Sequence, residues 1–273
     1  MRVHKMLMNG TGRTFIQETP ESDVHTQYGR IRASEINGKQ DGTIVHTDKG
    51  EALLIYTPQW IDTYKRIRRD AQIITFKDAG IILATAGLGP HTTIVEAGAG
   101  SGAMTCFLAQ HCKHVHTYDI SSHNLAVAKE NAELLGLLNI SYTQHDITIG
   151  LLHEADAILL DMPTPWEVFD KLQHIRIGGY VITYTPSAVQ LQKTRNEAEK
   201  QGLLHIRSIE VTERHWMVRE EAVRPTSQNT AFTAFICFFR YMGEEWKSIR
   251  PRPNPKGTKP SLPSEELMEE MFA

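Results

Sequence analysis

Residues 96–102 form a glycine-rich run, EAGAGSG, between an apolar strand-like pair and a segment that reads as helix. Gly98, Gly100 and Gly102 would let the backbone pass close to a ligand, because a Cβ at these positions would collide with it. Asp119 comes just after a second strand-like stretch, and its carboxylate could accept hydrogen bonds from both hydroxyls of a ribose. The order strand, glycine turn, helix, strand and acid predicts a nucleotide-type site at the carboxyl ends of parallel strands.

The spacing of these glycines narrows the ligand. They are spaced GxGxG and not GxGxxG, which leaves less room for a pyrophosphate above the helix N-terminus. This spacing favours S-adenosylmethionine, which has no phosphate, over a dinucleotide. The alternative is a glycine-rich turn that only connects two elements, and the surrounding strand, helix and acid weaken it.

A second informative run, DMPTPW at residues 161–166, ends an apolar strand-like segment. It should therefore face the same crevice as the glycine turn. Proline fixes φ and lacks an amide hydrogen, so the chain is stiff here and its carbonyl groups are free to accept. Asp161 or a prolyl carbonyl could accept from the exocyclic amine of a planar base, and Trp166 could line the pocket. The alternative is a proline-rich turn with Trp166 packed into the core.

Two further features each allow a functional interpretation and a purely structural one. Asp146 follows a third strand-like stretch and could bind the adenine amine of the cofactor, with Ile147 against the ring, or it could cap a helix. The basic cluster at residues 65–69 could hold a phosphate backbone, or it could be a solvated helix face. The basic tail from Lys247 to Lys259 allows the same two interpretations, wrapping nucleic acid or remaining disordered.

Composition excludes several classes of protein. The chain has 273 residues, a net charge of −3 and no apolar run as long as a membrane span. Its thirteen histidines form no HxxxH, HExxH or Cys/His array, and its three cysteines lack metal-ligand spacing. We therefore expect a cytoplasmic globular protein with buried thiols, no metal and no membrane partner.

The chain is expected to divide into three parts. Residues 1–65 resemble a small β-rich domain that is a candidate for RNA contact. Residues 66–245 alternate strands with helices, which predicts an α/β, Rossmann-like domain with an antiparallel pair at one edge of the sheet. Residues 246–273 form a Pro-rich tail, first basic and then acidic. Predicted strands are 43–46, 52–56, 94–96, 115–119, 140–144, 157–160, 180–184, 206–211 and 231–239; predicted helices are 60–70, 77–86, 103–110, 123–135, 165–173 and 188–201.

The chain resembles the tRNA adenine-N1 methyltransferases that modify position 58 of the T-loop, and in archaea also position 57. The resemblance runs from about Ile67 to Phe239. It rests on residues 77–79 (KDA), 95–102 (VEAGAGSG), 161–166 (DMPTPW), 178–180 (GGY), 184–186 (YTP), 213–219 (ERHWMVR), 224–225 (RP) and 230–232 (TAF). The glycine turn is shared by many methyltransferases, whereas the DMPTPW and ERHWMVR runs are more specific.

The resemblance implies a S-adenosylmethionine-dependent methyltransferase domain, an N-terminal β domain, tRNA as substrate and a homotetramer. It implies that Asp161 lies at the methyl-transfer site and is the catalytic residue. The residues expected to hold the cofactor are Glu96, Gly98, Gly100, Ser101, Gly102, Ala103, Met104, Asp119, Ile120, Asn124, Asp146, Ile147 and Asp161. The residues expected to contact tRNA are Lys65, Arg66, Arg69, Phe76, Trp166 and Arg219.

Two positions depart from the family pattern. Thr75-Phe76 stands where the family usually has Tyr-Pro, and Phe76 could replace the Tyr as an aromatic wall. Asn229-Thr230 stands where the family has His-Thr, so a titratable ring is lost. Two other functions stay open: a methyltransferase acting on a small molecule or a protein carboxyl, and a cofactor-free tRNA-binding subunit. The first does not predict the DMPTPW run, and the intact turn with Asp119 and Asp161 argues against the second.

Overall fold

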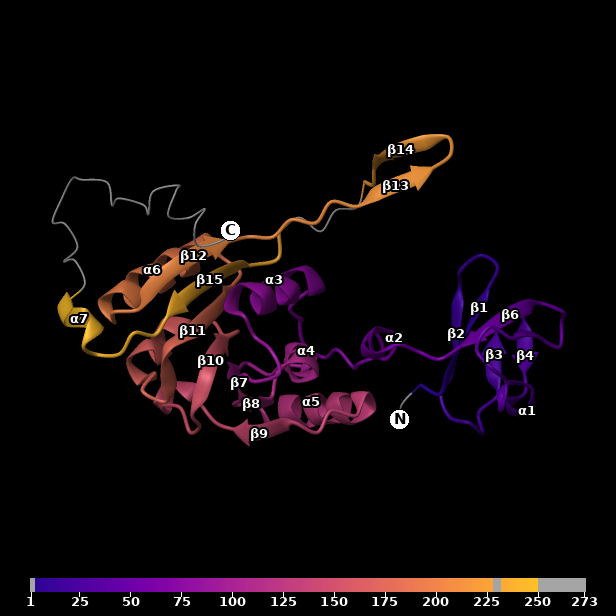
Figure 1. Cartoon of the computed structure of the whole chain (residues 1–273), viewed down its shortest axis with the longest axis horizontal. Coiled ribbons are helices and arrows are strands. Elements are labelled where there is room, and N and C mark those ends of the chain that lie inside the picture. Colours follow the sequence, from indigo (N-terminus) through magenta and orange to yellow (C-terminus); the bar gives the residue numbers. More distant parts are fainter. Residues whose placement is uncertain (1–2, 228–231, 250–273) are drawn as a thin grey trace.

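The structure is a computed structural model that describes residues 3–227 and 232–249. A small N-terminal β domain is joined by a short helix to a larger α/β domain, from which a hairpin projects (Figure 1). Asn229, Thr230, Arg250, Arg252, Lys256, Lys259 and the acidic end at 265–270, all considered above, lie outside the described residues. Within those described, no helix is both long enough and apolar enough to cross a membrane.

The N-terminal domain is built from short antiparallel strands around its own core. Its elements are β1 (Lys5–Asn9), β2 (Thr14–Gln17), β3 (Val24–Thr26), β4 (Gly29–Ile31), α1 (Ala33–Ile36), β5 (Ile44–His46) and β6 (Ala52–Tyr56). One sheet has the order β2-β1-β6-β5, and β3 pairs with β4. Leu53 and Ile55 of β6 are fully buried while Leu54 between them is exposed, as expected when alternate side chains of a strand point to opposite faces.

A short linker leads into the α/β domain through α2 (Trp60–Tyr64) and α3 (Phe76–Ala86). The prediction of a helix over 60–70 is wrong beyond Tyr64. Ile67 turns into the core, and the amide and carbonyl of Arg68 bond to the side chain of Asn131 instead of continuing a helical ladder. The basic residues 65–69 therefore lie in a turn and an extended stretch, and not along one helix face.

The α/β domain contains one seven-stranded sheet. Its strands are β7 (Thr93–Ala97), β8 (His114–Asp119), β9 (Ile140–Gln144), β10 (Ala155–Leu160), β11 (Ile175–Thr185), β12 (Leu204–Ile209) and β15 (Phe235–Arg240), in the order β12-β15-β11-β10-β7-β8-β9. β15 runs antiparallel to both of its neighbours, β11 and β12, and the pair of β12 and β15 forms one edge of the sheet, which confirms the expected antiparallel pair there. The chain runs outward from β7 to β8 on one side and returns to β10 on the other, so the topological switch point lies between β7 and β10.

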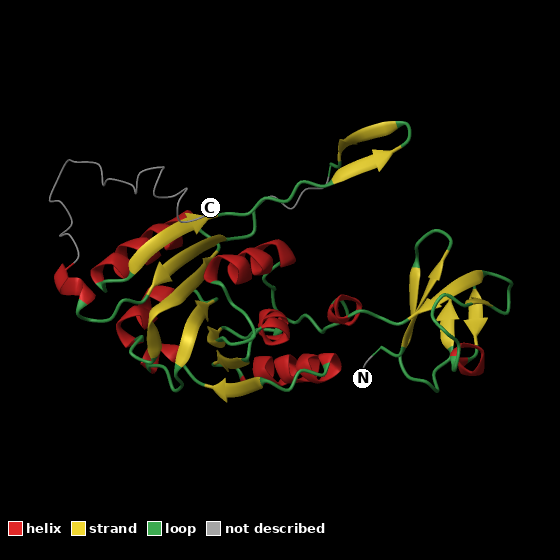
Figure 2. Ribbon diagram, viewed as in Figure 1, coloured by secondary structure: helices red, strands yellow, loops and turns green. Residues whose placement is uncertain are grey.

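Helices cover both faces of this sheet (Figure 2). They are α4 (Ala103–His111), α5 (Ser122–Leu135), the 3-10 turns η1 (Ile147–Ile149) and η2 (Pro165–Lys171), α6 (Ala188–Lys200) and α7 (Trp246–Ile249). Neighbouring strand residues enter different cores: Ile94 packs with α3 and α4, whereas Val95 packs with η2 and α6. Burial on both faces explains why the central strands read as continuous apolar runs.

Two local predictions need correction. The segment predicted as a helix over 165–173 is the 3-10 turn η2, in which the Lys171 ammonium takes the carbonyl of Glu167 that an α-helical amide would use. The sequence also did not predict the hairpin β13 (Trp216–Arg219) and β14 (Ala222–Pro225), which projects from the domain between β12 and β15 (Figure 1). The predicted strand 231–239 begins only at Phe235.

Candidate active site

The ends of three parallel strands converge at the switch point. The amide of Asp161, just after β10, donates to the carbonyl of Ala97 at the end of β7 over 2.9 Å. The amides of Gly98 and Ala99 both donate to the carbonyl of Tyr118 in β8, over 3.0 and 3.2 Å. A cleft of about 270 Å³ opens here. Its lining residues are Ala71, Gln72, Ile74, Glu96, Gly98, Ala99, Gly100, Met104, Asp119, Asn124 and Asp161.

The glycines of the turn are required by the protein's own packing. Gly98 has a φ of +93°, and a Cβ there would overlap with the backbone carbonyl of Asp161. Gly102 has a φ of +73°, and a Cβ there would overlap with Ala128 of α5. The sequence suggested only that these glycines leave room for a ligand. The structure shows that packing within the protein also requires them. They let β10 and α5 approach the turn closely.

Asp119 is held in place by three donors and is nearly buried. The Gly100 amide and the side-chain amide of Asn124 donate to its Oδ2 over 3.0 and 3.1 Å. The Ser121 amide donates to Oδ1 over 2.8 Å. A carboxylate offers about four acceptor positions, so Oδ1 keeps capacity for a ligand hydroxyl. Asn124 thus has a clear role, which is to orient the Asp119 carboxylate.

Glu96 lies at the bottom of the cleft and is almost fully buried. Its Oε2 accepts from the hydroxyls of Thr105 and Thr117, over 2.5 and 2.8 Å. Burial, together with the nearby charges of Asp161 and Asp119, raises the pKa of Glu96 to about 8, although the two hydrogen bonds act in the opposite direction. The site therefore holds a carboxyl group that is largely protonated when no cation is near.

Asp161 projects from the end of β10 at the edge of the same cleft and is partly exposed. Among residues 3–227 and 232–249, no donor forms a hydrogen bond with its carboxylate. Burial raises the pKa of Asp161 to about 7. An unpaired acceptor with a raised pKa in a cleft is typical of a group that meets a ligand.

A buried polar cluster joins α3 to the end of β11, and the sequence did not identify it as a cluster. Asp78 is fully buried and accepts from Lys77, Thr75, Tyr184 and Thr233 over 2.6 to 3.0 Å. Burial opposes ionisation, yet these hydrogen bonds outweigh it and lower the pKa of Asp78. The cluster fixes α3 against the end of β11, and its signal in the sequence is the KDA run.

Several predicted cofactor residues lie in or next to the cleft. Met104 lines it, while Ser101 and Ala103 are buried in the turn and at the start of α4. Ile120 directly follows Asp119, with 71 % of its surface exposed.

The structure does not bring Asp146 and Ile147 into this cleft. Asp146 caps η1 by accepting from the amide and hydroxyl of Thr148, which lower its pKa, and Ile147 is buried in the core. In this structure Asp146 therefore has the role of a cap residue.

The predicted tRNA-contacting residues are spread over three places. Lys65, Arg66 and Arg69 are exposed, and none forms an ion pair with a described residue. Phe76 does not reach the cleft, because its ring packs against Tyr64 and Phe107, at centroid distances of 5.0 and 6.0 Å.

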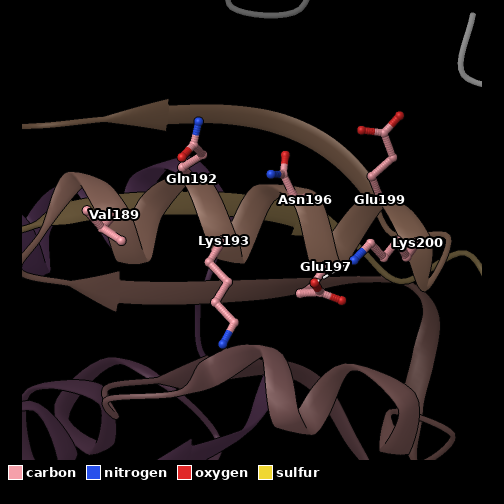
Figure 3. Close-up of a pocket in the computed structure, with 7 residues that line it drawn as sticks. All are labelled: Val189, Gln192, Lys193, Asn196, Glu197, Glu199 and Lys200. Carbon is pink, nitrogen blue, oxygen red and sulfur yellow. Dashed lines mark hydrogen bonds and ion pairs between the residues drawn. The ribbon is translucent and has the colours of Figure 1, made fainter. Parts of the chain in front are cut away.

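The other two predicted contacts also lie outside the cleft. Trp166 packs against the core below α6, with the Lys193 ammonium 4.2 Å from its ring. In Figure 3 the side chain of Lys193 points away from Gln192 and Asn196 on α6; Lys193 lines a groove of about 460 Å³ that shares no residue with the cleft. Arg219 lies on the projecting hairpin (Figure 1).

Sequence reasoning missed one side of the cleft. Ala71, Gln72 and Ile74 come from the irregular stretch between α2 and α3. The only signal in the sequence is indirect: the stretch leads directly into the KDA run at residues 77–79. Nothing in its composition suggests a ligand.

Comparison with known proteins identifies a family for most of the chain. Residues 53–234 match the family described as tRNA methyltransferase complex GCD14 subunit. The tRNA (adenine(57)-N(1)/adenine(58)-N(1))-methyltransferase TrmI of Methanocaldococcus jannaschii is 27 % identical, over 88 % of this chain and 95 % of that protein. The tRNA (adenine(58)-N(1))-methyltransferase TrmI of Thermus thermophilus is 28 % identical, over 89 % of this chain and 97 % of that protein.

A solved structure supports the same fold. The SAM-dependent O-methyltransferase of Thermotoga maritima superposes with a TM-score of 0.80 and 26 % identity, over 89 % of this chain and 94 % of that one. The Rossmann-like methyltransferase fold predicted from the sequence is therefore confirmed. Because the family match covers more than half of the sequence, the chain belongs to the tRNA methyltransferase complex GCD14 subunit family.

Proposed function

We propose that this protein transfers a methyl group from S-adenosylmethionine to N1 of adenine at position 58 in the T-loop of tRNA. The observation that carries the proposal is the carboxylate of Asp161, which has no hydrogen-bond donor among the described residues and lies against the glycine turn at the switch point. Position 58 appears in the names of the relatives from both organisms, whereas position 57 appears only in that of the Methanocaldococcus jannaschii enzyme. Methylation of adenine at position 57 as well is a second candidate activity, and mapping of the methylated position in tRNA distinguishes the two.

The acidic side chains of the cleft suit S-adenosylmethionine. The cofactor supplies an electrophilic methyl group on a positively charged sulfur. Glu96, Asp119 and Asp161 place three carboxyl groups around the cleft, a favourable environment for a cation. Asp119, oriented by Asn124, is the acceptor for ribose hydroxyls, and the bend at Gly98 and Gly100 keeps side chains out of the way.

In the methyl-transfer step, Asp161 acts on the target base. N1 of adenine is unprotonated at neutral pH, so no strong general base is required for its attack. Positive charge develops on the purine as the methyl group arrives. The Asp161 carboxylate accepts the N6 hydrogen and stabilises that charge in a partly desolvated site, which is worth more there than in water. The remaining contribution is alignment of the two reactants.

The tRNA must be gripped outside the cleft and the base extruded into it, because position 58 is stacked in folded RNA. Lys65, Arg66 and Arg69 are exposed, lack protein partners among the described residues and lie next to the stretch that lines the cleft. They are the proposed phosphate contacts, together with the N-terminal domain. Trp166 and Arg219 remain candidates for contacts with RNA outside the cleft.

Assembly into a homotetramer is part of the proposal. Trp216, Val218 and Val223 of the β13–β14 hairpin are 54 to 73 % exposed. Val218 pairs with Val223 and Trp216 with Pro225, so these side chains share one face of the hairpin. An isolated hairpin is marginal in water, and an exposed apolar patch is typical of an interaction surface. A second copy of the chain is the proposed partner, and the cytoplasm the proposed compartment.

Methylation in vitro tests the function. Tritiated S-adenosylmethionine is incubated with unmodified tRNA transcripts, with transcripts carrying guanine at position 58, and with a small-molecule extract. Mass mapping of nuclease fragments should place one methyl group on adenine 58 and none on the variant transcript. Label in the small-molecule extract alone would favour the other methyltransferase classes. Calorimetry that detects no cofactor binding would favour a tRNA-binding subunit instead.

A further inference from the structure

Residues 68–74, termed the strap, pass beside the glycine turn without regular secondary structure. Ala71, Gln72 and Ile74 of the strap line the cleft. A Cβ added to Gly100 would come within 3.5 Å of the Cβ of Ala71, so the strap and the turn are in van der Waals range. One side of the cleft is therefore provided by the linker that follows the N-terminal domain, and not by the sheet.

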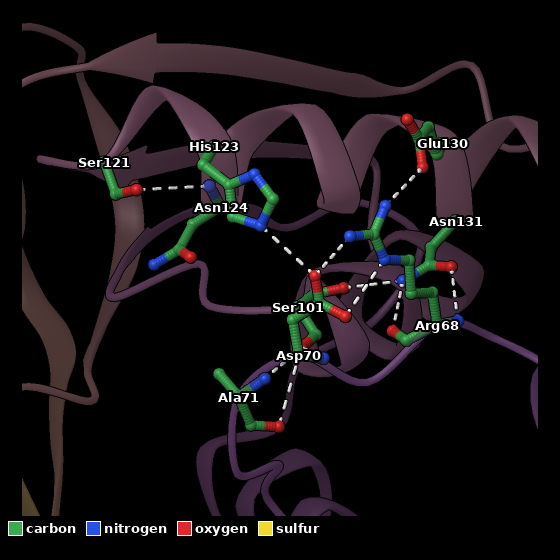
Figure 4. Close-up of polar contacts among 9 residues, drawn as sticks. All are labelled: Arg68, Asp70, Ala71, Ser101, Ser121, His123, Asn124, Glu130 and Asn131. Atoms are coloured by element: carbon green, nitrogen blue, oxygen red, sulfur yellow. Dashed lines mark hydrogen bonds and ion pairs between the residues drawn. The ribbon is translucent and has the colours of Figure 1, made fainter.

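Ser101 binds the strap to the glycine turn. Its hydroxyl oxygen accepts from the backbone amides of Asp70 and Ala71, both over 2.8 Å (Figure 4). Ser101 is only 2 % exposed, so these bonds are shielded from water. Backbone amides that lose water must find a protein acceptor, and this hydroxyl satisfies two of them.

Asn131 joins the strap, the turn and α5 through one side chain. Its Nδ2 donates to the carbonyl oxygens of Arg68 and Ser101, and its Oδ1 accepts from the Arg68 amide, all over 2.8 Å (Figure 4). Asn131 is also only 2 % exposed. Both ends of its amide are used, and no other single side chain in Figure 4 contacts the strap and the turn together with the helix behind them.

Charged groups add an outer layer. The Arg68 guanidinium donates twice to the Asp70 carboxylate, over 2.9 and 2.6 Å, and His123 lies 3.2 Å from the same carboxylate. Arg68 also reaches Glu130 over 3.5 Å. These side chains are largely exposed, and exposed ion pairs contribute little. The buried bonds of Ser101 and Asn131 are therefore the main anchors of the strap.

We propose that Asn131 and Ser101 are positioning residues of the cofactor site, which hold the strap in the conformation that completes the cleft around S-adenosylmethionine. This inference rests on the proposed function, because it takes that cofactor as the ligand. If the anchors were lost, the strap would have to become ordered as the cofactor binds, and the entropy of ordering would weaken binding. Neither side chain touches Asp161, so the effect falls on affinity and not on methyl transfer.

Two variants and one matched control test the proposal in the full-length protein. Asn131→Asp replaces two donated hydrogens by an acceptor, and Ser101→Ala removes the acceptor for two amides. Glu130→Gln, the control, removes only the exposed pair with Arg68 one position earlier on α5. We expect the Kd and KM for S-adenosylmethionine to rise about tenfold in each of the first two, the effect of one net hydrogen bond or slightly more, and to stay unchanged in the control. The value of kcat at saturating cofactor and tRNA should stay close to wild type.

The outcomes separate this inference from the proposed function. Wild-type protein that binds no S-adenosylmethionine would contradict the function itself. Wild-type protein that binds and methylates, with variants of unchanged Kd and KM for the cofactor, would overturn only the positioning role, even if their melting temperatures fall. If Asn131→Asp does not fold, Ser101→Ala decides, and a wild-type Kd in that variant overturns the proposal.

Discussion

The backbone carbonyl oxygen of Asp161 occupies the space that a Cβ on Gly98 would need. The bend proposed to make room for the cofactor and the residue proposed to meet the target base are therefore in direct backbone contact. The Asp161 amide also donates to Ala97, one position before the glycine. A side chain added to the turn at Gly98 should consequently displace Asp161 as well.

Gly98→Ala should abolish both cofactor binding and activity. Gly98 has a φ of +93°, which costs a residue with a side chain about 1–3 kcal/mol, and the overlap with Asp161 adds to this. Gly80→Ala in α3 is the matched control, because Gly80 has open space around it and helix-interior alanine is favoured by about 0.5–1 kcal/mol. Calorimetry with S-adenosylmethionine and thermal melting would measure both. Wild-type affinity in Gly98→Ala would contradict the close contact.

Asp161→Asn should lower kcat by roughly 10²-fold or more, the usual loss when one preorganised polar group is removed from a reacting centre. The amide keeps the size of the side chain but cannot stabilise the charge that develops on the purine. Single-turnover methylation with saturating tRNA and cofactor isolates this step. Binding of tRNA should be nearly unchanged and serves as the control. Near-normal turnover would remove the electrostatic role assigned to Asp161.

Affinity for S-adenosylmethionine should rise with pH between about 6 and 8. The pKa of Asp161 is raised to about 7 by burial, so a cation that binds beside it favours the ionised form and releases a proton. The affinity gain per pH unit is at most about tenfold for one group, and it levels off above the pKa. Calorimetry in two buffers of different ionisation enthalpy counts the protons released. The Asp161→Asn variant should release fewer protons, and a flat profile in the wild type would contradict the raised pKa.

Much of this site was accessible from the sequence because its parts follow strand ends. Gly98 and Asp161 directly follow β7 and β10, and Asp119 is the last residue of β8; parallel strands bring such positions to one edge of a sheet. The alternation of strands and helices gave the correct fold class for the same reason. The local sequence pattern and the spacing along the chain were sufficient to predict where these residues lie.

The contacts of the strap and of the aromatic side chains could not be predicted from the sequence, because they join residues that are far apart along the chain. The partner of Arg68 is Asn131, which is 63 positions away, and no local pattern reports that pairing. Phe76 was expected in the cleft because it stands next to the position of a family Tyr. Neighbouring residues on a helix point in different directions, and the Phe76 ring meets Tyr64 instead.

Stability of the protein without cofactor should fall as pH rises from about 4.5 to about 8. The pKa of Glu96 is raised from 4.5 to about 8 in the folded state, so in this interval the unfolded chain releases a proton that the folded chain keeps. The loss from this one group is on the order of 4 kcal/mol. Denaturant titrations at several pH values would measure it. Glu96→Gln should remove the contribution of Glu96 to the slope and leave that of Asp161, whose pKa is also raised, to about 7, and equal slopes in both proteins would contradict the assignment.

Reversal of charge at Arg66 and Arg69 should weaken tRNA binding and flatten its dependence on salt. Each phosphate contact that is lost lowers the slope of log affinity against log salt by roughly 0.7–0.9. Lys200→Glu is the control, because Lys200 is also exposed but pairs with Glu197 on α6, away from the strap. Filter binding with tRNA over a range of salt concentrations gives both quantities. Cofactor affinity, measured in parallel, should not change. If the double variant binds tRNA like the wild type at low salt, the phosphates are held elsewhere, and the N-terminal domain becomes the remaining proposed surface.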